Sequence, residues 1–331
     1  MSAAGDRLVL ADVEAARAVL ARHLRPTPLR PSLAAPGTDL RLKLECWQPT
    51  GSFKVRGALC LLSALGEAER RRGVVAASAG NHALGVAFAV SRLGGSVKAT
   101  LFVPRTAPRS KVEKLRRFPV EVRETGLTYD NAVKTARAFE RETGAVFVQA
   151  YDDPCVAAGQ GTVGLEVLDE CPEVGTVLVP VGGGGLIAGL AAAVKARAPD
   201  VRVVAVQPDA SPALRESLRL GRPLLTYPAG PTLADGLSGG IGEIVFAHRD
   251  LVDEVVTVSE EEIEDAIVAL VACDQVVAEA SGAVGVAALR AGKVASASRG
   301  PVVAVVTGGN LDVPVLARLL ASRYPDGEAG R

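Results

Sequence analysis

Residues 176–196 read TVLVPVGGGGLIAGLAAAVKA, an apolar run followed by four glycines and a second stretch of small and apolar residues. The first run, residues 176–181, is rich in valine and almost continuously apolar, which is typical of a strand buried on both faces in a parallel sheet. The glycines at 182–185 allow a sharp turn and a close approach of a ligand to the backbone. This strand, turn and helix predict one unit of an α/β fold.

The same pattern recurs at GVVAASAGNHALGVAFAV (73–90), VKATLFVPRTAPRSKVEKL (97–115) and VRVVAVQPDASPALRESL (201–218). Strands that alternate with helices predict mostly parallel sheets with helices on both faces. Glycine- and proline-rich loops around Gly51 and after Tyr151 are candidate boundaries. We therefore expect two three-layer open-sheet domains, with residues 1–50 and 152–331 forming a large one and residues 51–151 a smaller one inserted in it.

Local signals support several of these elements. Ser259 and Glu262 have the spacing of a capping box, which predicts that a helix begins after Ser259. Pro108 is expected in the first turn of the helix in APRSKVEKLRRF, where proline is tolerated. The last strand is predicted in PVVAVVT (301–307), followed by a turn at GGN (308–310).

Composition excludes several classes of protein. The 331 residues carry no net charge, and no basic stripe with interleaved aromatic residues is found, so nucleic acid is not an expected partner. The N-terminus lacks the pattern of a signal peptide, and the uncharged run 174–194 contains Pro180 and four glycines, which argues against a membrane span. Five widely spaced cysteines predict buried free thiols in a reducing cytoplasm, without a disulfide framework or zinc site.

The four glycines predict an anion site. Several amide N–H groups can converge there on one anion, helped by the positive end of the helix that follows, and a phosphate is the natural occupant. Neither a P-loop nor the dinucleotide pattern fits, since no Lys-Ser or Lys-Thr follows and the last glycine spacing is wrong. Close packing of the helix on the strand is the alternative interpretation.

SAGNHALG (78–85) is a second strand-to-helix turn. Ser78, Gly80 and Asn81 place a hydroxyl, a flexible backbone and an amide near a helix N-terminus, which suits a carboxylate. An ordinary helix N-cap is the alternative. His82 could carry a proton, although we expect a hydrogen-bonded scaffold role.

A phosphate site and a carboxylate site together suggest a phosphorylated cofactor that handles a small acid. Pyridoxal phosphate is one such cofactor, and it requires a lysine for its Schiff base. Lys111 and Lys114 are expected on a solvated helix face, and Lys43 is expected to point outward from LRLKLE. Lys54, in PTGSFKVRG (49–57), has an aromatic neighbour and small, turn-forming surroundings that would desolvate its amine and lower its pKa.

Six ordered motifs now point to a family: GSFKVRGA, SAGNHALGVA, AAGQGTVGLEV, PVGGGGLIAG, ADGLSGGIGE and VTGGN. They resemble those of serine/threonine dehydratases, which are fold-type II, tryptophan-synthase-β-like pyridoxal-phosphate enzymes, over about residues 13–320. The resemblance implies dehydration and deamination of L-threonine or L-serine to 2-oxobutanoate or pyruvate and ammonia, catalysed by a cytoplasmic homodimer. Dehydration of 3-hydroxyaspartate, phenylserine or a hydroxylated compatible solute, serine racemization, β-replacement and a non-catalytic binding module are the alternatives.

The resemblance also implies roles for individual residues. Lys54 would form the Schiff base and then act as the base at Cα, while Phe53 packs near the ring and Asn81 binds its 3′-oxygen. Thr307 would face the pyridine nitrogen as a neutral partner. The implied phosphate-binding residues are Gly182, Gly183, Gly184, Gly185 and Leu186, and those of the substrate-carboxylate loop are Ser78, Ala79, Gly80, Asn81 and His82.

Departures from related families narrow these expectations. Serine racemases have a second serine where this chain has Ala79, which has no titratable group, so elimination without efficient racemization is expected. Their acidic metal ligands are replaced here by Gln207, Ser211 and Ala213, so no metal is expected. Asp209, a nearby acidic residue, leaves a divalent cation as an alternative. The sequence ends soon after the last motif, which predicts no regulatory domain and no isoleucine feedback. Asp235 and Glu279 either shape the substrate pocket or cap loops.

Overall fold

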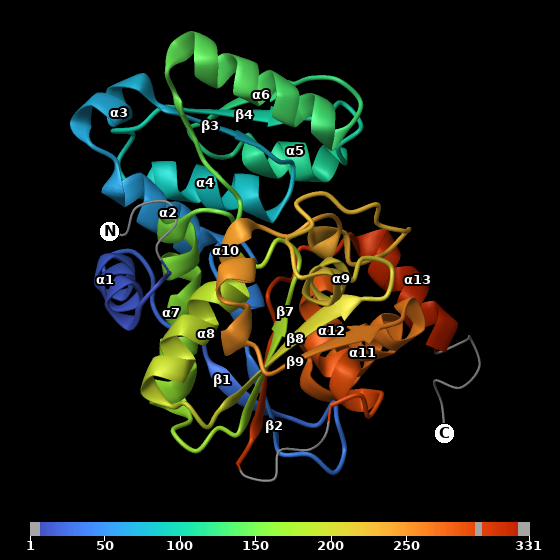
Figure 1. Cartoon of the computed structure of the whole chain (residues 1–331). Helices are drawn as coiled ribbons and strands as arrows, with labels where there is room; N and C mark the ends of the chain where they lie inside the picture. The colour runs from blue at the N-terminus through green and yellow to red at the C-terminus, as the bar shows by residue number, and fades with distance from the viewer. Residues whose placement is uncertain (1–6, 295–299, 324–331) are drawn as a thin grey trace.

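Two open sheets organise the chain, and each forms the centre of one lobe of the molecule (Figure 1). The computed structural model describes residues 7–294 and 300–323. The strands of the smaller sheet all lie between residues 74 and 147, and those of the larger sheet lie before residue 44 or after residue 175. The predicted α/β class with mostly parallel strands is confirmed.

The larger sheet has six strands, and only its edge pair β1–β2 is antiparallel among the strands that the structure describes. In spatial order they are β1 (Leu29–Ser32), β2 (Leu40–Lys43), β10 (Val302–Val305), β7 (Thr176–Pro180), β8 (Arg202–Pro208) and β9 (Glu254–Val258).

Successive residues of these strands enter two different cores, because strand side chains alternate between the faces of a sheet. Leu178 and Val204 belong to the core on one face, and Val177 and Val203 to the core on the other. Helices α11 (Glu260–Asp274) and α12 (Ala280–Arg290) cover the first face, and α7 (Pro154–Glu170) and α8 (Gly185–Arg197) the second. This arrangement explains why the strands read as continuously apolar.

The smaller sheet is entirely parallel, with the order β5 (Glu121–Glu124), β4 (Ala99–Val103), β3 (Val74–Ala77) and β6 (Val146–Phe147). Leu101 faces the core shared with α4 (Asn81–Arg92), whereas Phe102 faces the core under α6 (Tyr129–Thr143). Helix α2 (Lys54–Ala64) packs on both α4 and α7, and so joins the two lobes.

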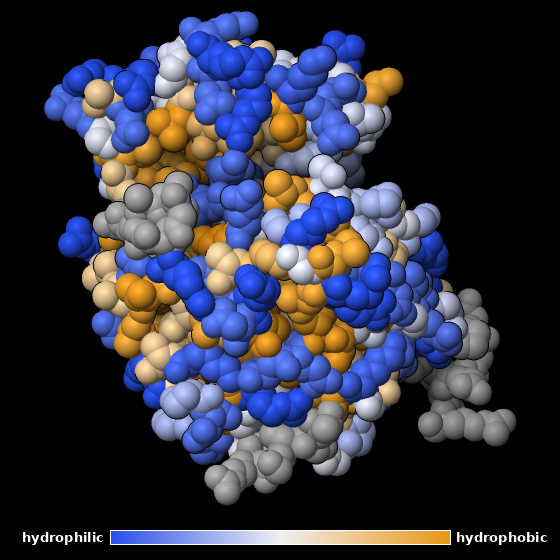
Figure 2. Space-filling view, in the orientation of Figure 1, coloured by the Kyte–Doolittle hydropathy of each residue, from blue (hydrophilic) through white to orange (hydrophobic). Residues whose placement is uncertain are grey.

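The remaining helices complete the outer layers. They are α1 (Leu10–Leu20), α3 (Glu67–Arg72), α5 (Arg109–Leu115), α9 (Ala213–Leu220), α10 (Glu243–Ala247) and α13 (Val313–Arg323), with the short 3₁₀ turns η1 (Glu45–Trp47), η2 (Asp235–Leu237) and η3 (Arg249–Leu251). Figure 2 shows hydrophilic side chains over most of the outer surface of the smaller lobe, with hydrophobic ones on its side toward the larger lobe.

Most local predictions agree with the structure. The capping box is confirmed, since the N–H of Ser259 donates to Glu262 Oε2 at 2.7 Å at the start of α11. Pro108 is the N-cap of α5 and not part of its first turn. Four cysteines are buried free thiols as expected, whereas Cys273 is exposed. No helix among the described residues is long and apolar enough to cross a membrane.

The expectation that Lys43 points outward is wrong. Its side chain is completely buried, and its Nζ atom lies 2.8 Å from Glu166 and 2.7 Å from Glu170, both on α7. The two carboxylates are four positions apart and face the sheet from the same side of the helix. A buried lysine is tolerated there because its charge is paired.

Candidate active site

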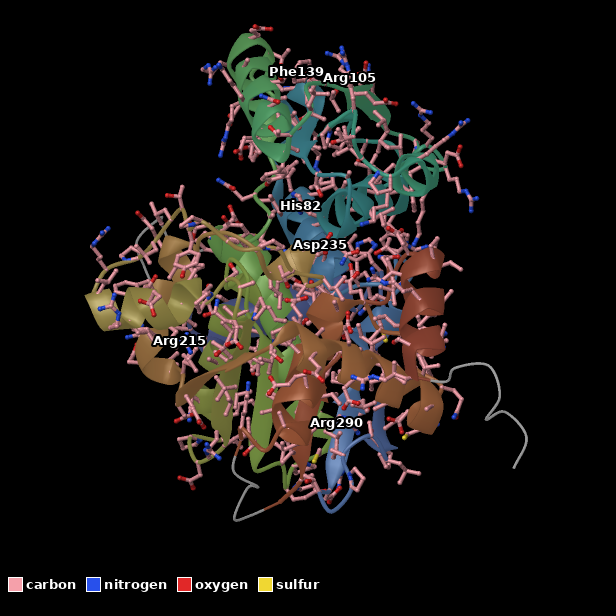
Figure 3. The ribbon with its side chains drawn as sticks, turned by 90° about the vertical axis from the view of Figure 1, so that its right-hand side faces the viewer. His82, Arg105, Phe139, Arg215, Asp235 and Arg290 are labelled. Carbon is pink, nitrogen blue, oxygen red and sulfur yellow. The ribbon has the colours of Figure 1, made fainter. Side chains whose placement is uncertain are left out.

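The predicted site residues lie at the carboxyl ends of parallel strands, where open α/β sheets bind their ligands. The glycine turn follows β7, Thr307 follows β10, and the turn from Ser78 to Asn81 follows β3 of the other sheet. Figure 3 shows His82, at the start of α4, in the region where the two lobes meet, above Asp235 of the larger lobe.

Lys54 is the first residue of α2, and the turn before it is fixed to the segment after β10. The Phe53 N–H donates to the Thr307 carbonyl at 3.1 Å, and the Gly309 N–H donates to the Gly51 carbonyl at 2.9 Å. Gly51 has a φ of +78°, and a Cβ there would also press on the side chain of Asn310. Glycine is required at this turn for both reasons.

Lys54 is half-buried, and its amine lies beside a backbone carbonyl and an aromatic ring. Its Nζ atom donates to the Ala150 carbonyl at 2.8 Å and lies 5.0 Å from the centre of the Phe53 ring. Burial lowers the pKa of Lys54 to about 8, while the carboxylate of Glu279 partly opposes that shift. A sizeable share of neutral amine is therefore present near neutral pH, as a nucleophile or a base requires.

The turn after β3 places polar groups at the start of α4. The Gly80 N–H donates to Ser78 Oγ at 3.1 Å, and Gly80 faces open space, since a Cβ there would meet no atom within 4 Å. Ala79 is half-buried against the apolar core of the smaller lobe. The N-terminal N–H groups of α4 have no partner within the helix and are available to an anion beside Gly80.

His82 is a scaffold residue. Its Nε2 atom is 2.9 Å from the Val148 carbonyl, and its side chain is buried. Burial, followed by the nearby charge of Lys54, lowers the pKa of His82 to about 4. The hydrogen bond joins α4 to the segment after β6, and a ring that is neutral near physiological pH agrees with the expected scaffold role.

The glycine turn is closely packed, and it also leaves backbone N–H groups without partners among the described residues. A Cβ on Gly183 would collide with the Tyr151 ring, and one on Gly184 would collide with Val245, so close packing requires glycine here. Among the hydrogen bonds of the described residues, none has the N–H of Gly182, Gly183 or Gly184 as its donor. These groups lead into the N-terminus of α8, which begins at Gly185, and the unpaired donors suit a phosphate.

Thr307 is buried at the end of β10, and its Oγ1 atom has only a long contact of 3.4 Å with the Ser281 carbonyl. Two further hydroxyls just before Lys54, Thr50 Oγ1 and Ser52 Oγ, are buried and have no hydrogen-bond partner among the described residues. Buried polar groups are normally paired. Two of these three hydroxyls are unpaired and the third is only weakly bonded, which agrees with a polar ligand in this part of the molecule.

An ion-pair network anchors the helix that carries Lys54. Arg56, two residues further on, donates to Glu45 Oε2 at 2.8 Å and Oε1 at 2.6 Å, and to Glu166 Oε1 at 2.6 Å. Burial alone would raise the pKa of Glu45, but the Arg56 guanidinium holds it below its ordinary value. The network ties α2 to η1 and α7, and so fixes the position of Lys54 relative to the larger lobe.

Glu279, which the sequence places in the substrate pocket or at a loop cap, belongs to this region, and the sequence does not predict the contacts of two further members, Asn310 and Lys114. Glu279, which precedes α12, accepts a hydrogen bond from Asn81 Nδ2 at 2.6 Å, and burial raises its pKa to about 7. Asn310 ends the motif VTGGN, from which its contacts cannot be predicted. Lys114, which the sequence predicts on a solvated helix face, is half-buried, and its Nζ atom donates to Asn310 Oδ1 at 2.5 Å. Lys111 and Lys114 are three positions apart and share one helical face, and this pair of lysines is the feature of the sequence that could have indicated a shared contact.

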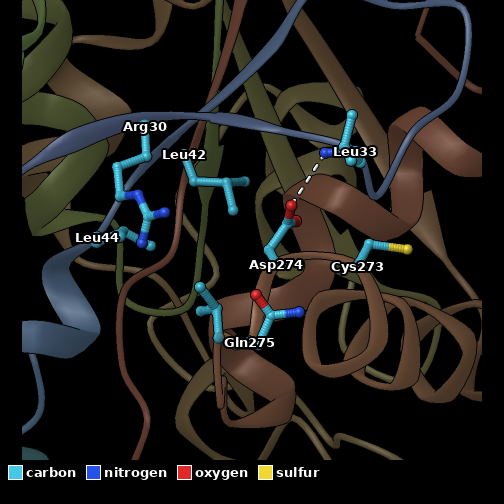
Figure 4. Close-up of a pocket in the computed structure, with 8 residues that line it drawn as sticks. Arg30, Leu33, Leu42, Leu44, Cys273, Asp274 and Gln275 are labelled. Carbon is cyan, nitrogen blue, oxygen red and sulfur yellow. Dashed lines mark hydrogen bonds between the residues drawn. The ribbon is translucent and has the colours of Figure 1, made fainter.

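Two other places do not belong to the site. Gln207, at the position of a metal ligand in serine racemases, has a structural hydrogen bond here, since its Oε1 accepts the Leu214 N–H at 3.0 Å. Among the described residues, no group of three acidic, histidine or cysteine side chains could hold a metal. A surface pocket of about 90 Å³ lies between β1, β2 and the end of α11, where the Leu33 N–H donates to Asp274 (Figure 4). None of the predicted site residues lines it.

Comparison with known proteins identifies the class. Residues 20–308 match the family described as pyridoxal-phosphate dependent enzyme. The chain therefore belongs to the pyridoxal-phosphate dependent enzymes, and within them to the fold-type II serine/threonine dehydratase group.

Particular relatives support this placement. The chain is 44% identical to the L-threonine ammonia-lyase of Thermotoga maritima over 95% of this chain and 78% of that protein. It is 40% identical to the catabolic L-threonine dehydratase TdcB of Escherichia coli K12, over 85% of each chain. Among solved structures it resembles maize serine racemase, with a TM-score of 0.89 and 34% identity over 96% of this chain and 98% of that one.

The residues present fit the cofactor of this family. Unpaired N–H groups at the glycine turn match a phosphate, and the Lys54 amine has a lowered pKa. Two buried hydroxyls without partners among the described residues, Thr50 Oγ1 and Ser52 Oγ, belong to the turn that precedes Lys54. The roles of the individual residues are developed below as part of the proposal.

Proposed function

We propose that the protein is a pyridoxal-phosphate-dependent ammonia-lyase that converts L-threonine or L-serine to 2-oxobutanoate or pyruvate and ammonia. The observation that carries the proposal is the half-buried amine of Lys54, whose pKa is lowered to about 8. The substrate class is supported by relatives named L-threonine ammonia-lyase and L-threonine dehydratase, which are 44% and 40% identical to this chain.

When bound, pyridoxal phosphate supplies an aldehyde for a Schiff base and a ring that draws electron density from Cα. We assign to Lys54 the amine that would hold the cofactor aldehyde, and in its neutral form the same amine would accept a proton from the substrate Cα at Nζ. Phe53, which packs on the core of the larger lobe, bounds the ring. The N–H groups of Gly182, Gly183, Gly184, Gly185 and Leu186 hold the phosphate.

The turn from Ser78 to His82 holds the substrate carboxylate through the N-terminal N–H groups of α4. Asn81 has a side-chain N–H for the 3′-oxygen of the cofactor, and Thr307 offers its hydroxyl to the pyridine nitrogen. A hydroxyl is a neutral partner, so it does not hold that nitrogen protonated as a carboxylate would. A neutral partner at the pyridine nitrogen would favour loss of the β-hydroxyl over transamination.

Serine racemization is the second candidate, because serine racemases are among the relatives and the matching structures. Ala79 argues against it, since an alanine cannot return a proton to Cα from the opposite face. We therefore propose elimination as the main reaction. Dehydration of another β-hydroxy amino acid, such as 3-hydroxyaspartate, phenylserine or a hydroxylated compatible solute, uses the same groups and differs only in the side-chain pocket.

The proposal extends to assembly, location and domain division. We propose a homodimer, which is supported by two exposed apolar residues near the pocket of Figure 4, since clustered exposed apolar residues mark contact surfaces. Leu33 lines that pocket, and the Trp47 ring lies 5.7 Å from the guanidinium carbon of Arg30, which also lines it. A cytoplasmic location is supported by five free thiols. A smaller domain of residues 51–151, inserted between residues 1–50 and 152–331, is supported by the separation of the two sheets along the chain.

The test is a keto-acid assay over a panel of β-hydroxy amino acids, with borohydride reduction and mass spectrometry to locate the modified lysine. We expect 2-oxobutanoate from L-threonine, cofactor mass on the peptide containing Lys54, and no turnover by Lys54→Ala. Lys134→Ala, on the exposed face of α6, is the matched control and should keep the normal rate. Normal turnover by Lys54→Ala would refute the assignment.

A further inference from the structure

Hydrogen bonds connect four polar side chains in a line between the two lobes. Lys114 Nζ donates to Asn310 Oδ1 at 2.5 Å, Asn310 Nδ2 donates to Asn81 Oδ1 at 2.6 Å, and Asn81 Nδ2 donates to Glu279 Oε1 at 2.6 Å. Lys114 and Asn81 come from α5 and α4 of the smaller lobe. Asn310 and Glu279 lie in the larger lobe, after β10 and before α12.

The chemistry of the members fixes the direction of every bond in this line. A lysine ammonium only donates and an ionised carboxylate only accepts, whereas each amide has one accepting oxygen and one NH₂ group. Asn310 therefore turns its oxygen to Lys114 and gives its two hydrogens to Asn81 and to the Thr50 carbonyl, which is 2.9 Å away. Asn81 is left with one side-chain N–H that no described residue accepts.

We propose that Lys114 is a positioning residue that, by holding Asn310, keeps the Asn81 amide turned so that its free N–H faces the bound pyridoxal phosphate. This inference rests on the proposed function, because it takes the cofactor to lie beside Asn81. Lys114 acts from the far side of Asn310 and is not itself placed against the cofactor. Through its hydrogen bond to Asn310, Lys114 also connects α5 to the larger lobe.

A second contact of α5 shows why Lys114 is the stronger connection. Lys111 Nζ lies 3.9 Å from Asp235 Oδ2, but that carboxylate is 79% exposed. An ion pair so open to solvent contributes little. The Lys114 bond is shorter and half-buried, and the carboxylate of Glu279 is close enough to oppose partly the burial that lowers the pKa of Lys114.

Removing Lys114 leaves the half-buried oxygen of Asn310 without its donor, so the amide is free to move and Asn81 loses a fixed partner. The experiment compares apo wild type, Lys114→Met and Lys114→Gln by titration with pyridoxal phosphate, followed by cofactor absorbance. We expect Lys114→Met to weaken cofactor binding about tenfold, the size of one lost hydrogen bond. Lys114→Gln keeps a donor and should recover most of the affinity, and Lys134→Met is the matched control.

A double-mutant cycle with Asn310→Ala tests whether Lys114 acts through Asn310. If it does, Lys114→Met costs no further affinity in the Asn310→Ala background, because the effects of coupled residues do not add. Equal losses in both backgrounds, or no loss in Lys114→Met alone, would overturn the inference. An increased KM confined to acidic substrates, at unchanged cofactor affinity, would also overturn it and make Lys114 a substrate-binding residue. Failure of wild type to bind pyridoxal phosphate would refute the proposed function instead.

Discussion

Arg56→Met is the substitution for which the structure makes the sharpest stability prediction. Arg56 is 1% exposed and Glu45 is completely buried, and the two are joined by hydrogen bonds of 2.8 and 2.6 Å. Methionine fills much of the same volume but cannot donate a hydrogen bond. Among the residues that the structure describes, the Glu45 carboxylate would then keep Thr27, at 2.5 Å, and Gln48, at 3.1 Å, as its direct partners.

The expected cost follows from this loss of charge compensation. Removing one partner of a buried ion pair costs about 3–5 kcal/mol, because the other charge stays buried without its counterion. Glu166 adds less to this cost, since its side chain is 12% exposed and it retains Lys43 at 2.8 Å. We therefore expect the free energy of unfolding to fall by about 3–5 kcal/mol, most of it through Glu45.

Urea unfolding of the apo protein measures this change. Trp47, the only tryptophan, lies in the same 3₁₀ turn as Glu45, and its fluorescence can be compared with circular dichroism to test for a single transition. Arg109→Met is the control: its pair with Glu113 is 92% and 54% exposed, so we expect a loss below about 1 kcal/mol.

A second variant separates charge from shape. Glu45→Gln in the Arg56→Met background removes the stranded carboxylate and should restore much of the lost stability. If Arg56→Met were as stable as wild type, or if Glu45→Gln made it still less stable, the reasoning from uncompensated charge would be wrong.

Two further predictions concern pH. Because burial lowers the pKa of Lys54 to about 8, the apo protein should bind pyridoxal phosphate faster as the pH rises to about 8, and the rate should then level off. Stopped-flow absorbance can follow this rate. A rate that keeps rising through pH 10 would contradict the lowered pKa. The pKa of His82 is about 4 when folded and 6.5 when unfolded, so the unfolded state binds more protons between these values and stability should fall as the pH drops from about 6.5 to 4. His82→Gln should remove the part of this loss that is due to His82, about 2 kcal/mol between urea titrations at pH 7 and pH 5, and an unchanged pH dependence would contradict it.

Much of the fold could be predicted because its information is local. Strands such as β7 and β8 are buried on both faces, so they appear in the sequence as unbroken apolar runs, and the alternation with helices defines the class. The burial of Lys43 could not be predicted in this way. Its partners Glu166 and Glu170 lie on a helix more than a hundred residues later, and only the packed structure brings them under β2.

The residues of the candidate site also fall into two groups, those predictable from adjacent residues and those that depend on distant partners. Lys54, the glycine turn and the turn from Ser78 to Asn81 each lie in one short motif at the start of a helix, so their surroundings can be inferred from adjacent residues. Glu279, Asn310 and Lys114 depend on partners 196–229 positions away. For Lys114 the sequence indicates only that it shares a helical face with Lys111. Whether that face meets water or an amide depends on how the lobes pack, and that packing arises from contacts spread over the whole chain. The same separation makes the Lys114 and Asn310 cycle informative, because a coupling between residues so far apart in sequence reports directly on how the two lobes meet.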